Sequence, residues 1–152
     1  MTTDKLLVKS IIFAEDDEHD RVFFRDAFEK FDLLILFEFV SNGRQLMELL
    51  NNYLPDLLFL DLEMPYKNGL QCLKEIRQNP VLKALPVVVF SSTSRPGNIQ
   101  AAYEMGAHLF LVKPPSYAEY KESLYAILEL DWRNPENIRE QFCMNGKYGA
   151  FN

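Results

Sequence analysis

Carboxylates, a hydroxyl group and an ammonium group stand directly after short apolar segments of this sequence. One apolar segment ends on Asp61, and an earlier one is followed by Glu15 and Asp16. Two later segments end just before Ser91 and Lys113. Side chains of these types bind metal ions, hold phosphate groups and act as nucleophiles. Their shared position after apolar segments predicts that the fold brings them together in one site.

The carboxylates of such a site need a positive partner. Two like unit charges about 4 Å apart repel each other by about 4 kcal/mol at an effective dielectric constant of about 20. Mg²⁺ prefers hard oxygen ligands and completes its coordination with waters and phosphate oxygens. A carboxylate can attack phosphorus and form an aspartyl phosphate, while the metal, an ammonium group and a hydroxyl group hold the equatorial oxygens. The residue set therefore predicts Mg²⁺-assisted phosphoryl transfer to an aspartate of this site.

The segment that carries Asp61 predicts a buried strand. Residues 57–60 are all apolar, and Pro55 and Pro65 bound a segment that is too short for a free-standing helix. Such runs are typical of strands buried on both faces of a parallel sheet. In open α/β sheets, ligands bind just outside the carboxyl ends of the strands, so Asp61 at such an end faces a site.

Strand and helix patterns alternate five times along the chain. Strands are predicted at residues 6–14, 33–40, 57–61, 86–90 and 109–112. Helical spacing of apolar residues is found at residues 17–31, 46–50, 70–78, 99–105 and from Ser116 onward. Ser116 and Glu119 also have the spacing of a capping box. The alternation predicts an α/β fold, with a doubly wound parallel sheet of five strands and helices on both faces.

Length and composition fit one domain with a proper core. The chain has 152 residues, of which 48% are hydrophobic. Residues 1–130 are predicted to form this domain. Residues 131–152 form a short C-terminal extension with two helix-compatible turns around residues 135–142, and this extension is too small to be an independent domain.

Aromatic residues in the extension leave two arrangements open. Trp132 is expected to anchor the extension by hydrophobic contact. Phe142, Tyr148 and Phe151 either fold back over the domain or form part of a homodimer contact.

Charge and targeting patterns argue against several classes of protein. Lys and Arg number 16 against 22 Asp and Glu, a net charge of −6, whereas free-standing nucleic-acid binding needs a basic surface. No basic leader and no apolar run of membrane-spanning length is found, so we expect a cytoplasmic protein without membrane insertion. Cys72 and Cys143 lack metal-ligand spacing and are expected to be free thiols. His19 and His108 are expected to be surface or packing residues.

In type and order, the polar residues resemble the signature of bacterial response-regulator receiver domains of the CheY-like kind. The resemblance covers nearly all of residues 6–130. Each element of the signature is weak alone, but the set is specific. The elements are an acidic pair, a phosphoacceptor with a following Met-Pro and Gly, a hydroxyl residue and a Lys-Pro pair, here Glu15-Asp16, Asp61, Met64-Pro65, Gly69, Ser91 and Lys113-Pro114.

The resemblance implies a divalent metal site. Asp16 and Asp61 would ligate Mg²⁺ or Mn²⁺ directly, together with the backbone carbonyl of Glu63. Glu15 would act largely through water. The sheet would have the flavodoxin-like strand order 2-1-3-4-5, which puts the first and third strands at the point where the order reverses.

The resemblance also implies a phosphoryl-binding site and a switch. Asp61 would be the phosphorylated residue, and Ser91 and Lys113 would bind the phosphoryl group. Ser91 would then move inward, and Phe110 would follow it as the aromatic switch residue. The peptide bond before Pro114 is often cis in this family, so we expect a cis bond here.

By the same resemblance, the chain is a response regulator of a two-component system. A histidine kinase or a histidine phosphotransfer protein would phosphorylate Asp61 and thereby switch the face of the fourth helix, fifth strand and fifth helix, where a downstream protein docks. The chain would accept and lose the phosphoryl group without turning over a substrate as a conventional enzyme does. A stand-alone regulator and a phosphorelay member both fit. Residues 90–96 and the extension are similar to single-domain regulators paired with phytochrome-like kinases.

Two other families and a purely structural interpretation compete with this one. Residues 61–63 are similar to the acid-x-acid motif of haloacid-dehalogenase-like phosphatases, but that family places its acidic metal pair late in the chain. A flavodoxin-like flavin binder needs a hydroxyl and glycine loop after the first strand, where this chain has residues 15–17, all acidic. Taken alone, Glu15 and Asp16 could cap a helix, and Lys113 could be a solvated lysine.

Overall fold

Strands and helices alternate along the chain as predicted. The computed structural model describes residues 8–31, 35–92 and 94–144. The strands are β1 (Ser10–Ala14), β2 (Leu36–Val40), β3 (Leu57–Asp61), β4 (Val87–Ser91), β5 (Leu109–Val112) and β6 (Cys143–Met144). The helices are α1 (Glu18–Phe31), α2 (Gly43–Leu50), α3 (Gly69–Gln78), α4 (Pro96–Glu104), α5 (Tyr117–Leu128), α6 (Pro135–Ile138) and the short 3₁₀ helix η2 (Arg139–Gln141).

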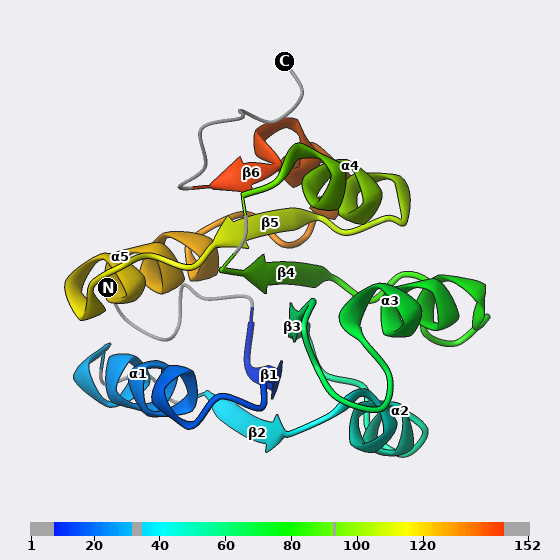
Figure 1. Cartoon of the computed structure of the whole chain (residues 1–152), viewed down its shortest axis with the longest axis horizontal. Helices are drawn as coiled ribbons and strands as arrows, with labels where there is room; N and C mark the ends of the chain where they lie inside the picture. The colour runs from blue at the N-terminus through cyan, green and yellow to red at the C-terminus, as the bar shows by residue number, and fades with distance from the viewer. Residues whose placement is uncertain (1–7, 32–34, 93, 145–152) are drawn as a thin grey trace.

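All six strands lie in one parallel sheet with the order β2-β1-β3-β4-β5-β6 (Figure 1). The predicted order 2-1-3-4-5 of the first five strands is confirmed. Every residue of β3 and β4 is buried, as expected for central strands covered on both faces. The strand order reverses between β1 and β3, so a ligand crevice is expected at their carboxyl ends.

Helices cover both faces of the sheet. In Figure 1, α1 and α5 lie on one side, and α2, α3 and α4 lie on the other. The core under α1 and α5 is rich in phenylalanine: the ring centroid of Phe13 lies 3.8 Å from that of Phe24 and 4.9 Å from that of Phe90. The core on the other face is built of aliphatic side chains from β3, β4 and the covering helices. Close packing on both faces fixes the strand ends that carry the site.

Several element boundaries differ from the sequence prediction, among them the starts of β1 and α4. β1 begins at Ser10 instead of residue 6, and residues 6–7 lie outside the described residues. α4 begins at Pro96, although the sequence interpretation placed its start near Ile99. Proline is tolerated in the first helical turn because the amides there have no intrahelical acceptor.

Side-chain caps set the starts of α2, α3 and α5. Asn42 accepts a hydrogen bond from the backbone of Gln45 at the start of α2. A capping box with Gln71 starts α3 at Asn68. At α5, Ser116 accepts from the amide of Glu119, but the Glu119 carboxylate lies at the Ser116 hydroxyl, so the predicted capping box forms only in its first half.

The C-terminal extension packs onto the edge of the sheet. The two predicted helical turns are confirmed as α6 and η2. β6 was not predicted, because a strand of two residues has no recognisable period. It pairs with Phe110 and Leu111 of β5 and covers an edge that would otherwise be open.

Side chains of the extension enter both cores. Trp132 is buried and donates from Nε1 to the carbonyl of Ile127 at 2.8 Å, so the predicted anchor is confirmed. Ile138 lies in the same core, and Phe142 is fully buried in the other, so it folds back over the domain. Tyr148 and Phe151 lie outside the described residues.

The thiols were expected to be free. Cys72 is buried and forms no disulfide bond. The side chain of Cys143 lies outside the part of the chain whose side chains are described.

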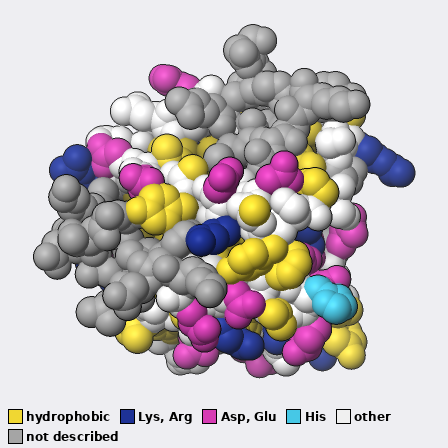
Figure 2. All heavy atoms as spheres, turned by 90° about the vertical axis from the view of Figure 1, so that its left-hand side faces the viewer, with side chains coloured by type: hydrophobic (Ala, Val, Ile, Leu, Met, Phe, Trp, Pro, Cys, Tyr) yellow, Lys and Arg dark blue, Asp and Glu magenta, His cyan; other side chains and the backbone are white. Residues whose placement is uncertain are grey.

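Acidic side chains are spread over the surface. Figure 2 shows one side of the molecule, where acidic side chains surround hydrophobic ones and basic side chains are scattered between them. This distribution agrees with the net charge of −6. Within residues 8–31, 35–92 and 94–144, no helix combines the length and the apolar composition that crossing a bilayer requires.

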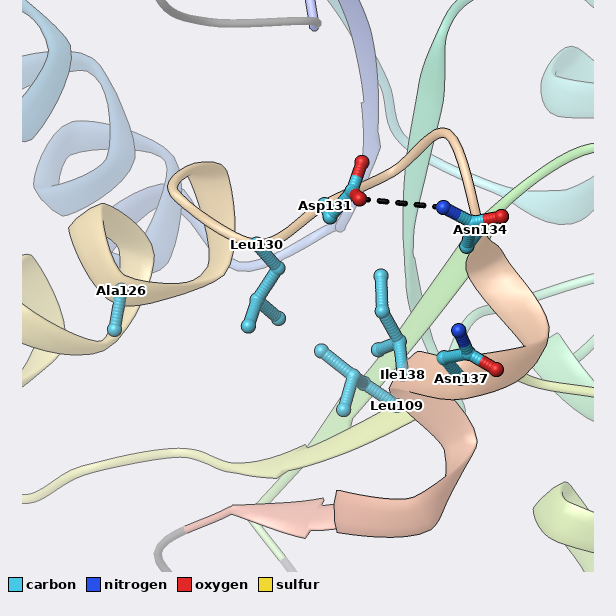
Figure 3. A pocket seen from close by; sticks show the side chains of 7 residues that line it. All are labelled: Leu109, Ala126, Leu130, Asp131, Asn134, Asn137 and Ile138. Atoms are coloured by element: carbon cyan, nitrogen blue, oxygen red, sulfur yellow. Dashed lines mark hydrogen bonds between the residues drawn. The ribbon is translucent and has the colours of Figure 1, made fainter.

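A small pocket lies between the extension, α5 and the first residue of β5. Its volume is about 240 Å³. Figure 3 shows Leu109, Leu130 and Ile138 around it, with Asp131 and Asn134 hydrogen-bonded to each other at its margin. The pocket lies at the end of β5 opposite Lys113, so it is separate from the predicted site.

Candidate functional site

The predicted site residues lie at the carboxyl ends of four neighbouring strands. Glu15 follows β1, Asp61 and Ser91 are the last residues of β3 and β4, and Lys113 follows β5. The register of the parallel strands brings these four ends to one edge of the sheet. The fold therefore assembles residues that lie far apart in the sequence.

Three carboxylates form a compact cluster. Glu15, Asp16 and Asp61 each offer an oxygen, and these oxygens lie within 4.8 Å of one another. Glu15 and Asp61 are buried and Asp16 is exposed. Asp17 has a different role, because its side chain accepts hydrogen bonds from the amides of His19 and Asp20 and caps α1. The capping interpretation was made for Glu15 and Asp16, but the residue that caps α1 is Asp17, and Glu15 and Asp16 belong to the cluster.

Lys113 is surrounded by carboxylates. Its Nζ lies 2.7 Å from Oε1 of Glu15, 2.8 Å from Oδ2 of Asp20 and 3.5 Å from Oδ2 of Asp61. It also lies 5.0 Å from the ring centroid of Phe90. Sequence reasoning missed Asp20, because it is one of several acidic residues on α1.

Burial and neighbouring charges shift the pKa values of Glu15 and Lys113. Burial and the neighbouring carboxylates of Asp61 and Asp20 raise the pKa of Glu15 to about 11. The 2.7 Å contact with Lys113 is compatible with this pKa, because a carboxyl oxygen accepts that hydrogen bond in either protonation state. Burial disfavours the charged form of Lys113, but its contact with Asp20 and the charges of Asp61 and Glu15 outweigh burial and raise its pKa above the ordinary value.

The cluster fits a divalent cation. Oε2 of Glu15 is buried and has no hydrogen-bond partner within the described residues. An orphaned carboxylate oxygen beside two further carboxylates matches the hard oxygen ligands that Mg²⁺ and Mn²⁺ prefer. A bound cation would also supply the positive charge that the buried carboxylates lack.

The backbone around the cluster is held by specific contacts. Arg21 on α1 donates to the carbonyl oxygen of Glu15 at 2.7 Å and to the hydroxyl of Ser41 at 2.6 Å. The amide of Glu63 donates to Oδ1 of Asp61 at 3.1 Å. These bonds fix Asp61 and Glu15 before any ligand binds. The role of the Glu63 carbonyl as a ligand stays a prediction.

Gly69 allows α3 to begin directly against the site. A Cβ atom at this position would lie 2.4 Å from the carbonyl oxygen of Asp61 and 2.8 Å from Cα of Leu62. The Gly69 amide donates to the carbonyl of Leu62 at 3.0 Å. The glycine of the signature is therefore required by close backbone approach.

Ser91 and Phe110 are both fully buried. The carbonyl of Ser91 accepts from the amide of Lys113 at 2.8 Å, which ties the end of β4 to the start of the loop after β5. Phe110 packs beside Phe142, with ring centroids 6.3 Å apart, and its amide donates to the carbonyl of Phe142 at 2.7 Å. Their movement as a switch stays a prediction.

The expected cis peptide bond before Pro114 is wrong for this structure. The described residues contain no cis peptide bond. The expectation rested on the resemblance alone, and the trans form is favoured even before proline, by about 0.5 to 1 kcal/mol.

His19 is exposed and His108 is buried, as the surface and packing interpretation predicted. The described residues place neither of them in the carboxylate cluster.

Comparison with known proteins decides the family. Residues 11–125 match the response regulator receiver domain. The chain belongs to this family. A curated relative of this receiver domain is response regulator Rcp1 from Synechocystis sp., which is 32% identical over 110 residues, 72% of this chain and 69% of that protein. The phosphatase and flavin-binder interpretations are thereby excluded.

Solved structures show the same receiver fold. The Mn²⁺-bound form of Rcp1 has a TM-score of 0.74 at 28% identity and covers 81% of this chain and 96% of that chain. The phosphorylated cyanobacterial phytochrome response regulator RcpA has a TM-score of 0.69 at 25% identity and covers 89% of this chain and 94% of that chain. The chain is thus a receiver of two-component signalling with a cluster that fits a divalent metal.

In some relatives, the receiver domain makes up only part of a longer enzyme. A protein-glutamate methylesterase/protein-glutamine glutaminase from Syntrophomonas wolfei is 32% identical over 108 residues, but these cover only 30% of that protein. The match therefore says nothing about catalysis by this receiver itself.

Proposed function

We propose that this receiver takes a phosphoryl group onto Asp61 from a histidine kinase or a histidine phosphotransfer protein. The observation that carries the proposal is the position of Asp61, which shares a cluster with Glu15 and Asp16 and faces the ammonium of Lys113. A nucleophile, a metal site and a cation for the phosphoryl oxygens thus lie together at one strand end.

The two oxygens of Asp61 have different surroundings. Oδ1 accepts a hydrogen bond from the amide of Glu63, whereas Oδ2 faces Lys113 at 3.5 Å. Attack by Oδ2 on phosphorus forms an O–P bond and breaks the bond to the donor nitrogen. The ammonium of Lys113 and the hydroxyl of Ser91 would then hold phosphoryl oxygens. This arrangement stabilises charge where it develops.

The metal would be Mg²⁺ or Mn²⁺. Asp16, Asp61 and the Glu63 carbonyl would hold it, and Glu15 would reach it largely through water. When bound, it supplies positive charge that neutralises the phosphoryl oxygens. The receiver accepts the phosphoryl group and loses it to water, and it does not turn over a separate substrate as a conventional enzyme does.

The phosphorylation state would be read by a protein on the face of α4, β5 and α5. Ser91 and Phe110 would couple Asp61 to this face. Because β6 pairs with β5 and Phe142 lies beside Phe110, the partner would contact the extension as well. The acidic surface supports a protein partner over nucleic acid. A stand-alone regulator, a relay member and a homodimer all fit this face, and we place the protein in the cytoplasm.

Residues 1–130 would be the receiver, with residues 131–152 as an extension that is not a domain of its own. This division of the chain is supported by the positions of Trp132 and Phe142, which lie in the two cores of the receiver and form no core of their own.

Intact mass spectrometry tests the proposal. The protein is incubated with acetyl phosphate, with and without Mg²⁺, as wild type, Asp61→Asn and Asp17→Asn. We expect a Mg²⁺-dependent phosphoryl adduct in wild type and in Asp17→Asn, because Asp17 caps α1 and lies outside the cluster. Asp61→Asn should give none. An equal adduct in Asp61→Asn would remove the proposal.

A further inference from the structure

Carboxylates already engage two hydrogens of the Lys113 ammonium group in hydrogen bonds. It carries three donor hydrogens, and three carboxylates surround it. The contacts to Glu15 and Asp20 are short, at 2.7 and 2.8 Å, whereas the proposed phosphoacceptor Asp61 has the longest, at 3.5 Å. A phosphoryl group on Asp61 therefore has to compete with two closer carboxylates for Lys113.

Asp20 differs from the other two partners. Glu15 and Asp61 both belong to the group that could hold a metal, and within the described part of the chain this group does not include Asp20. Asp20 has no other assignment in the site. Its contact with Lys113 joins α1 to the loop after β5, across 93 residues of sequence.

The position of Asp20 is fixed by its helix. Its amide donates to the capping side chain of Asp17 at 3.3 Å, and the next residue, Arg21, binds both the Glu15 backbone and Ser41. The side chains of Asp20 and Lys113 are only 18% and 16% exposed, so water screens their attraction weakly. Asp20 thus holds Lys113 from a rigid support.

A phosphoryl group on Asp61 would compete with Asp20 for the ammonium group of Lys113. It brings a charge of about −1.5 to −2 close to Lys113. The carboxylate of Asp20 repels this charge and also occupies one hydrogen of the ammonium. Both effects weaken phosphoryl binding, whereas an uncharged side chain of the same shape would remove the repulsion and keep a weaker acceptor for Lys113.

We propose that Asp20 is a positioning residue that holds Lys113 in the unphosphorylated receiver and limits the affinity of the site for a phosphoryl group. The inference rests on the proposed function, because it takes Asp61 as the phosphoacceptor. Asp20 thereby sets how tightly Lys113 binds the phosphoryl group, and so how readily the site releases it.

Isothermal titration calorimetry with beryllofluoride at saturating Mg²⁺ tests the inference. Asp20→Asn should bind beryllofluoride about 5 to 10 times more tightly than wild type, which corresponds to about 1 kcal/mol of removed repulsion. Asp20→Glu, which keeps the charge and can reach Lys113, should return to within about twofold of wild type. Asp26→Asn removes the same charge from another position on α1 and should leave the affinity unchanged.

Each outcome has a defined meaning. Beryllofluoride affinity in Asp20→Asn that equals or falls below that of wild type would overturn the inference and leave the proposed function intact. An equal gain in Asp26→Asn would also overturn it, because the effect would then be one of net charge. Asp20→Ser serves if Asp20→Asn folds poorly and should change the affinity in the same direction. Absence of binding by wild type would overturn the proposed function together with the inference.

Discussion

The two ends of the sheet both bury ionisable side chains, but within residues 8–31, 35–92 and 94–144 only the carboxyl end has a buried carboxylate oxygen without a hydrogen-bond partner. At the amino end, Arg77 donates to the carbonyl oxygens of Lys83, Leu85 and Gly106 at distances of 2.7 to 3.2 Å. At the carboxyl end, Glu15 has an orphaned buried oxygen and a strongly raised pKa. The amino end is therefore a completed network, whereas the carboxyl end has the chemistry of a ligand site.

His108 completes the network at the amino end. Its Nδ1 accepts a hydrogen bond from the amide of Val87 at 3.1 Å, which assigns the ring hydrogen to Nε2. Burial, followed by the charges of Arg77 and Arg139, lowers the pKa of His108 to about 4. Glu136 lies 3.7 Å away but is exposed, so it does not offset burial. His108 is thus a neutral structural residue.

This contrast teaches that buried charge alone does not mark a functional site. Satisfied groups such as Arg77 stabilise the fold, whereas the crowding of Glu15 beside Asp61 costs stability, because Glu15 has to take up a proton unless a cation binds. Substitution at the two ends should therefore change stability in opposite directions.

Arg77→Ala should have the largest effect on stability. It would remove four hydrogen bonds to three carbonyl groups, of which those of Leu85 and Gly106 are bonded in partly buried surroundings, and we expect a loss of about 3 to 4 kcal/mol in the free energy of unfolding. Urea unfolding followed by circular dichroism measures the loss. Arg77→Lys, which keeps the charge but not the fork of donors, should recover only part of it. A loss below about 1 kcal/mol would show that this network is not structural.

Stability should also fall in acid through His108. Because its pKa is lowered from 6.5 to about 4 in the folded protein, the unfolded chain binds the extra proton more readily. Neutral His108 contributes up to about 3 kcal/mol to the free energy of unfolding. This contribution is fully present above pH 6.5 and is lost as the pH falls to about 4. Unfolding free energies measured across this window should fall less steeply in His108→Gln than in wild type. Parallel curves would contradict the assignment.

Glu15→Gln should give a smaller effect of opposite sign. Because the pKa of Glu15 is raised, folding without metal at pH 7 places a proton on a carboxylate that is ionised in the unfolded chain. The contribution of Glu15 to the free energy of unfolding is therefore complete below about pH 4.5 and declines as the pH rises toward 11. Glutamine needs no proton, so we expect the metal-free variant to gain about 1 kcal/mol.

Urea unfolding in EDTA and in Mg²⁺ checks this change. Mg²⁺ should stabilise wild type more than Glu15→Gln, since the variant loses one carboxylate of the cluster. A variant less stable than wild type in EDTA would mean that Glu15 is a structural group like Arg77.

The sequence predicted the strand ends well because burial and chemistry coincide there. Asp61 ends a run that has to be buried, so its polarity is conspicuous. Asp20 was missed because α1 also carries other acidic residues, and only the fold shows which of them meets Lys113. β6 and the network of Arg77 were missed because each depends on backbone atoms from distant segments, which leave no pattern in the sequence.

The central claim is that Asp61 carries the phosphoryl group, and chemical mapping tests it most directly. Borohydride converts an aspartyl phosphate to homoserine, which peptide mass spectrometry locates. After Mg²⁺-dependent phosphorylation of wild type, we predict homoserine at position 61 and at no other acidic residue. Homoserine at Asp16 or Asp20, or a phosphorylated protein in which no homoserine forms, would contradict the account.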